Sequence, residues 1–104
     1  MSTRSLVVGA ESTVARYVHS DGYPEHMVPA LKLMIKRDGI KVILANNWSS
    51  IGANPQPNLN NRDLFIKSDY YAADAEYVYE IDESTIKSFV VTGEGLVMIE
   101  EVNV

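Results

Sequence analysis

The stretch AEYVYEIDESTIKSFVVTGEGLVMIEEV, residues 75–102, decides the fold that we expect for this protein. It contains three runs rich in β-forming residues, and the first alternates, so that Tyr77, Tyr79 and Ile81 share one face of a strand. The polar triplets DES and GEG between the runs can turn the chain. The pattern predicts a three-stranded antiparallel meander over 75–81, 85–92 and 96–102.

The N-terminal end of the chain predicts a β-hairpin. RSLVVG (4–9) reads as a short strand with an apolar middle, and VARYVH (14–19) alternates. The intervening GAEST can reverse the chain, so the two strands are expected to pair with each other.

A helix is expected after the SDGYP segment, which breaks the strand pattern. Pro29 is costly in a helix interior but suits the first turn, which predicts a helix start near Met27 or Val28. The apolar stripe would then comprise Val28, Leu31, Met34 and Ile35. Gly39 is a natural end for this helix.

The middle of the chain is less regular. IKVILANNW (40–48) is compatible with either a buried strand or a short second helix. A long Asn/Pro-rich loop is expected over about 46–68, with the ring of Trp48 folded onto the core as an anchor. The whole pattern predicts one α+β domain over 1–104, in which an antiparallel sheet (the N-terminal hairpin plus the C-terminal meander) packs against one or two helices.

The composition excludes several classes of protein. The 104 residues include no cysteine, which excludes disulfides and thiolate metal sites. No apolar run approaches the roughly 18 residues of a membrane-spanning helix, and the N-terminus lacks the pattern of a signal peptide. We therefore expect no membrane partner.

Charge is distributed unevenly along the chain. Residues 1–68 hold eight Lys or Arg and five acids, a net charge of +3, whereas 69–104 hold nine acids and only Lys87, a net charge of −8. Non-specific nucleic-acid binding needs a dominant positive field and is not expected. The acidic end is either a solvated sheet face or a docking surface for a basic partner, which includes a second copy of the chain.

YVHSDGYPEH, residues 17–26, gathers residue types that occur in active sites. Its histidines and carboxylates could form a metal site, or a general base with its orienting acid. The simpler interpretation is a strand end, an Asp-Gly turn and a helix entry. Asp21, Gly22, Pro24 and Glu25 then each have a structural use, and His19 is the residue that this interpretation explains least. The candidate metal ligands are His19, Asp21, Glu25 and His26.

The start MSTRS and the motif YVHSDGYPEH together resemble a group of small uncharacterised bacteriophage and prophage proteins. Members typically begin Met-(Gly/Ser)-Thr-Arg-Ser and carry a Tyr-x-His-Trp-Asp-Gly-Tyr-(Pro/Leu)-Glu motif after the second strand. A late strand similar to EYVYEID (76–82) also recurs, whereas the Asn-rich loop has no counterpart. Ser20 stands where the group usually has Trp, which puts in doubt any contact that the Trp makes. The resemblance implies a bacterial host cytoplasm as the location and favours IKVILANNWSSIG (40–52) as a second helix that ends in a loop, but it implies no activity.

The function that we expect is therefore non-enzymatic, because no catalytic motif or phosphate-binding loop is recognisable and no cofactor is implied. A small phage accessory protein would bind a host macromolecule, most simply a host protein, and so inhibit host growth or a defence system. The binding face would be either the acidic meander or the candidate residues Arg4, Tyr17, His19, Asp21 and Tyr23. Two alternatives are a module that sequesters a nucleotide-like ligand, with Arg4 facing the phosphate, and a metal-dependent hydrolase. A homo-oligomer is compatible with each of them.

Overall fold

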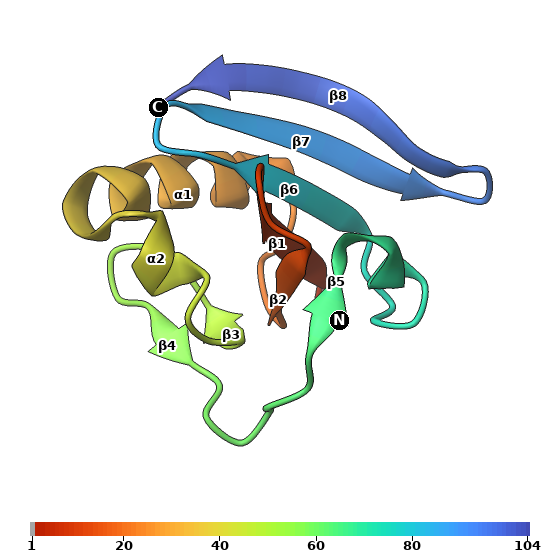
Figure 1. The fold of residues 1–104 in the computed structure, drawn as a ribbon, viewed down its shortest axis with the longest axis horizontal. Coiled ribbons are helices and arrows are strands. Elements are labelled where there is room, and N and C mark those ends of the chain that lie inside the picture. Colours follow the sequence, from red (N-terminus) through yellow and green to blue (C-terminus); the bar gives the residue numbers. More distant parts are fainter. Residues whose placement is uncertain (1) are drawn as a thin grey trace.

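The computed structural model describes residues 2–104 and contains an eight-stranded sheet with the order β4-β3-β2-β1-β6-β7-β8, in which β5 also pairs with β2 (Figure 1). Met1, the first residue of the MSTRS motif, lies outside the described residues. The strands are β1 (Ser5–Gly9), β2 (Val14–Val18), β3 (Trp48–Ser50), β4 (Gln56–Pro57), β5 (Phe65–Ile66), β6 (Tyr77–Ile81), β7 (Thr85–Thr92) and β8 (Gly95–Asn103). The helices are α1 (Pro24–Asp38), α2 (Ile40–Ile43) and the single-turn η1 (Lys67–Tyr70).

The predicted hairpin and meander are both confirmed, and they form one sheet. β1 pairs antiparallel with β2, and β6, β7 and β8 form consecutive antiparallel pairs. The two units join through β1 and β6, which run parallel from Ser5 opposite Tyr77 to Gly9 opposite Ile81. β2 and β3 are also parallel, so the α+β fold has an antiparallel-dominated sheet rather than a wholly antiparallel one. Parallel neighbours need a long connection, which α1 and the loops after it supply here.

The predicted start of α1, near Met27 or Val28, was wrong by three or four residues, because the helix begins at Pro24. Proline fits the first helical position, where its missing N–H would lack an intrahelical partner in any case. Pro29 lies inside the helix, which continues because its apolar face is buried from Met27 to Ile35. The predicted end is confirmed: Gly39 follows the helix with φ of 83°, and its N–H donates to the carbonyl of Ile35.

The middle of the chain is more structured than we expected. The undecided segment after Gly39 forms the short helix α2. The predicted loop over about 46–68 was wrong in part, because β3, β4 and β5 all lie within it and η1 begins there. These strands are two or three residues long and too short to alternate. They form through pairing: β3 and β5 pair with the distant strand β2, and β4 pairs with β3. The predicted anchor is confirmed: Trp48 is 4% exposed, and its Nε1 donates to the carbonyl of Ile43 at 2.8 Å.

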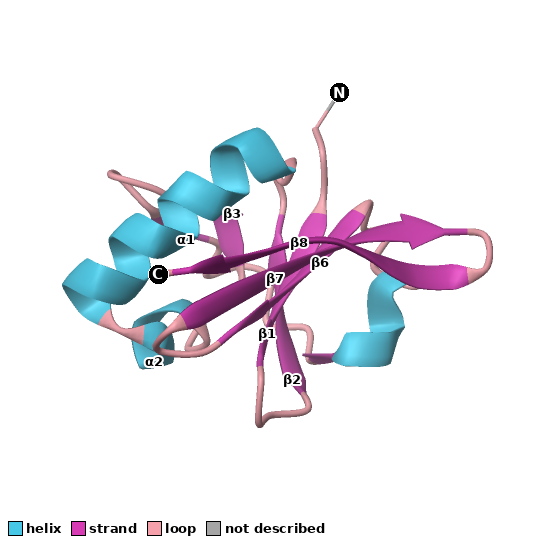
Figure 2. Cartoon of the chain, turned by 90° about the horizontal axis from the view of Figure 1, so that it is seen from above, coloured by secondary structure: helices cyan, strands magenta, loops and turns pink. Residues whose placement is uncertain are grey.

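Each face of the sheet has a cluster of buried apolar side chains. On one face α1 packs Met27, Leu31 and Met34 against strand residues that include Val18 and Tyr79. On the other face the segment 65–75, which contains η1, covers a second cluster (Figure 2). That cluster comprises Leu6, Val8, Ala15, Tyr17, Ala73, Ala75 and Val78. Within residues 2–104, no helix has the length and apolar character needed to cross a membrane.

Candidate functional site

Three of the five predicted binding residues lie together at the end of the sheet where β1 begins and β2 ends. The hydroxyl of Tyr17 and Nδ1 of His19 are 2.9 Å apart, and Arg4 lies close to the phenol of Tyr17. Burial raises the pKa of Tyr17, and the positive charge of Arg4 opposes that rise. His19, the least explained residue of the motif, thus has a structural partner in Tyr17.

Arg4 is already paired with a carboxylate. Its guanidinium donates to Asp74 at 2.5 Å, and its carbonyl accepts from the N–H of Glu76. The recess around it holds about 150 Å³ and is lined by Ser2, Arg4, Asp74 and Glu76. Two acidic residues beside Arg4 oppose the binding of a phosphate in this recess, so the geometry gives little support to the nucleotide alternative.

The other two predicted residues point elsewhere. Asp21 is exposed in the turn after β2, where its φ of 57° is that of a left-handed turn. Tyr23 caps the start of α1, and its ring centroid is 6.2 Å from that of His26. The five residues therefore do not form one pocket.

The four candidate metal ligands are not assembled either. His26 uses Nε2 for a 2.9 Å hydrogen bond with the carbonyl of Ile51, and His19 uses Nδ1 for Tyr17. In the part of the chain that the structure describes, no three His, Cys, Asp or Glu side chains are grouped so that they could hold a metal ion. The turn between His19 and α1 directs these side chains apart, which spacing along the sequence could not reveal.

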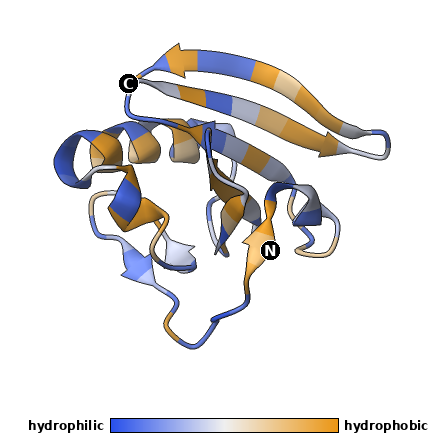
Figure 3. Cartoon of the chain, in the orientation of Figure 1, coloured by the Kyte–Doolittle hydropathy of each residue, from blue (hydrophilic) through white to orange (hydrophobic). Residues whose placement is uncertain are grey.

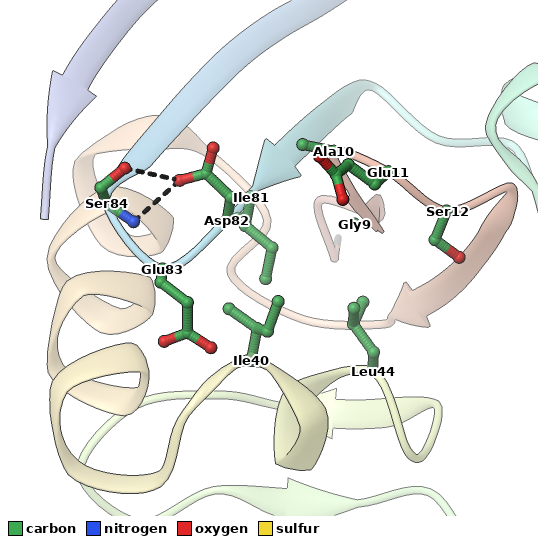
Figure 4. A pocket seen from close by; sticks show the side chains of 10 residues that line it. All are labelled: Gly9, Ala10, Glu11, Ser12, Ile40, Leu44, Ile81, Asp82, Glu83 and Ser84. Atoms are coloured by element: carbon green, nitrogen blue, oxygen red, sulfur yellow. Dashed lines mark hydrogen bonds between the residues drawn. The ribbon is translucent and has the colours of Figure 1, made fainter.

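A hollow of about 430 Å³ lies at the opposite end of β1 (Figure 4). Its apolar wall comes from Ile40, Leu44 and Ile81, and carboxylates stand around it. It is lined by Gly9, Ala10, Glu11, Ser12, Ile40, Leu44, Ile81, Asp82, Glu83 and Ser84. Sequence reasoning missed this hollow because its walls come from three separate segments of the chain.

The chemistry of this hollow is limited. The backbone N–H groups of Ser84 and Thr85 donate to Asp82 at 2.8 and 2.7 Å and lower the pKa of that carboxyl, which serves the β6–β7 turn. The described residues that line the hollow include two serines but no histidine or lysine to act as a base for them. Its shape and charge suit an apolar group that carries a positive charge.

The outer edge of β8 is a further feature that can contact another molecule. β8 is the last strand of the sheet, and within residues 2–104 it pairs with β7 alone. Val97, Met98 and Ile99 follow one another along it and are 50%, 50% and 48% exposed. Glu100 and Glu101 come next, so an apolar run and an acidic run adjoin on one strand (Figure 3). Long, apolar edge strands are uncommon in monomeric proteins, because they can pair with other chains.

No protein-family model, curated protein or solved structure matches this chain.

Proposed function

We propose that this chain is a small, non-enzymatic bacteriophage accessory protein that acts in the host bacterial cytoplasm by binding a host protein through the outer edge of β8. The observation that carries the proposal is the row of three half-exposed apolar residues on the last strand of the sheet. The phage source and the location rest on the resemblance of MSTRS and YVHSDGYPEH to phage and prophage proteins.

The polar side chains of the other candidate surfaces are already bonded within the chain, which favours the edge of β8 as the binding site. Arg4 is bound to Asp74, His19 to Tyr17, and His26 to the carbonyl of Ile51. Side chains that already satisfy one another gain little from an external ligand. The side chains of Val97, Met98 and Ile99, by contrast, gain from any contact that removes them from water.

The proposal is tested by affinity capture from a bacterial lysate with three forms of the protein. They are the wild type, the edge variant Val97→Lys/Ile99→Lys and the control variant Leu59→Lys/Leu64→Lys, which adds the same charge at exposed positions of the long loop. We expect a host protein that the wild type and the control variant retain and the edge variant loses. The retained protein is then purified and its binding measured directly with the same three forms.

Circular dichroism and thermal unfolding first establish that all three forms are folded. Equal capture by the edge and control variants, or no capture by the wild type, would overturn the proposal. A His19→Ala/Asp21→Ala variant tests the other predicted surface: loss of capture in that variant alone would move the binding site to the end of β2.

A further inference from the structure

We propose that the partner contributes an extended segment that pairs with β8 as an additional strand, with a basic side chain opposite Glu101 and an apolar side chain opposite Met98. This inference rests on the proposed function and names the chemistry of the partner. Backbone pairing at a sheet edge supplies affinity in such complexes, and the side chains that face the neighbouring strand supply specificity.

A row of apolar side chains that crosses four strands indicates an apolar partner residue opposite Met98. Leu6 on β1 lies opposite Val78 on β6, which lies opposite Phe89 on β7, which lies opposite Met98 on β8. Leu6 and Val78 are fully buried, Phe89 is partly buried, and Met98 is half exposed. A fifth strand with an apolar residue at this position would continue the row and cover Met98.

A neighbouring row of charged side chains on the same face indicates a basic partner residue opposite Glu101. Glu80 on β6 lies opposite Lys87 on β7, and Lys87 lies opposite Glu101 on β8. Lys67, from η1, adds a second positive charge beside this row, since its Nζ is 2.7 Å from Glu80. The charges therefore alternate from strand to strand, and the next position outward is one at which a Lys or Arg is favoured.

A β-bulge at Ile99 lies between the two rows and limits the length over which a partner strand can pair with β8. Phe89 and Lys87 are two residues apart on β7, whereas their partners Met98 and Glu101 are three apart on β8, so that Ile99 is the additional residue. The bulge places Met98 and Glu101 on the same face and interrupts the ladder between them. Such an edge suits one short strand rather than continuous stacking of many.

A second copy of the chain fits this edge poorly at neutral pH. β8 carries Glu100 and Glu101 and no basic residue, so two β8 strands cannot supply the positive charge that the row favours. Each copy would also bring a C-terminal segment, 69–104, with nine acids against one Lys, a net charge of −8. Electrostatic repulsion therefore favours a foreign, basic strand over self-association.

The test uses a displayed library of random nine-residue peptides, which matches the length of β8. The folded wild type, Glu101→Lys and Leu64→Lys proteins are each used for selection. We expect the wild type and the Leu64→Lys control to select peptides with Lys or Arg at one position and aliphatic residues nearby. Glu101→Lys should select Asp or Glu at the basic position and bind the wild-type peptides about threefold to tenfold more weakly.

Strand pairing is then separated from simple charge attraction by methylation of single backbone nitrogens in a selected peptide. Alternate methylations should abolish binding, because only every second N–H of an added strand points to β8. Three outcomes would overturn the inference: no positional preference, the same preference in Glu101→Lys, or a dimer at neutral pH that Val97→Lys/Ile99→Lys disrupts. If the host protein is captured normally by Glu101→Lys yet lost by the edge variant, the proposed function stands and this inference alone fails.

Discussion

The buried hydroxyl of Tyr79 ties the centre of the sheet to the turn that precedes α1. It donates to the carbonyl of Gly22 at 2.6 Å, and burial raises the pKa of the phenol, which therefore remains a donor. Gly22 itself lies against the start of the chain, where a Cβ atom would come within 2.7 Å of the carbonyl oxygen of Thr3. The turn of the YVHSDGYPEH motif thus depends on a glycine and on a tyrosine 57 positions away.

At this scale we predict that Tyr79→Phe lowers the free energy of unfolding by about 1–3 kcal/mol, because the buried carbonyl of Gly22 loses its donor while the ring remains packed. Urea unfolding at neutral pH measures the change. Tyr77→Phe is the matched control, since Tyr77 stacks on Tyr79 with ring centroids 6.4 Å apart but is less buried. Equal decreases in the free energy of unfolding of the two variants would contradict a stabilising role for the hydrogen bond from Tyr79 to Gly22.

At the scale of elements, Asn47 holds the long loop onto the edge of β2. β3 pairs with β2 at Val18, and β5 pairs with it at Val14 and Ala15. Between these strands the side chain of Asn47 takes the place of a strand: its Oδ1 accepts from the N–H of Tyr17 at 2.9 Å. Its Nδ2 donates at 3.0 to 3.2 Å to the carbonyls of residues 61 and 63 and to the side chain of residue 61. The buried side-chain amide of Asn47 thereby joins β2 to the segment 61–63, for which the local sequence predicts only a loop.

We predict that Asn47→Ala destabilises the protein by about 1–3 kcal/mol, since the N–H of Tyr17 is buried and loses its acceptor. Hydrogen exchange should show faster exchange at Tyr17 and Asp63, with little change in β7. Asn46→Ala, which removes the same side chain at the neighbouring position, serves as the control. Unchanged exchange at Tyr17 in the Asn47 variant would contradict the bridging role.

At the scale of the whole molecule, the net negative charge is expected to oppose pairing of the apolar edge of β8 with other copies. The net charge is −5 at neutral pH, and the sequence has an isoelectric point near 4.9. Near that pH the repulsion between copies is lost while the apolar run of β8 is unchanged. The same strand that would receive a partner is then free to pair with itself.

We therefore predict self-association near pH 4.9, measured by light scattering, and its reversal when the sample returns to neutral pH. Each variant is measured at its own isoelectric point. Val97→Lys/Ile99→Lys should remain monomeric there, whereas Leu59→Lys/Leu64→Lys should associate as the wild type does. If all three associate alike, another surface is responsible.

Much of this architecture could be predicted from sequence, because it depends on near neighbours along the chain. The strand runs of 75–102 specify the meander, since strand pairing through short turns requires little besides β-forming residues and a turn. Gly39 marks the end of α1 for the same reason: a positive φ is a local requirement that glycine meets. The residue types of YVHSDGYPEH also indicate a turn and a helix entry without reference to the rest of the chain.

Only the tertiary structure determines how these strands and helices pair and pack against one another. β3 and β5 form because they pair with the edge of β2, and β4 forms because it pairs with β3. Asn47 holds the segment 61–63 between them to Tyr17, and no local pattern encodes these contacts. The candidate residues of YVHSDGYPEH separate because one turn sends His19 toward Tyr17 and Tyr23 to the start of α1. Most of all, a sequence shows that Val97, Met98 and Ile99 are apolar but not that their strand is the last in its sheet. Exposure depends on which distant strands remain unpaired, and that is a property of the assembled molecule.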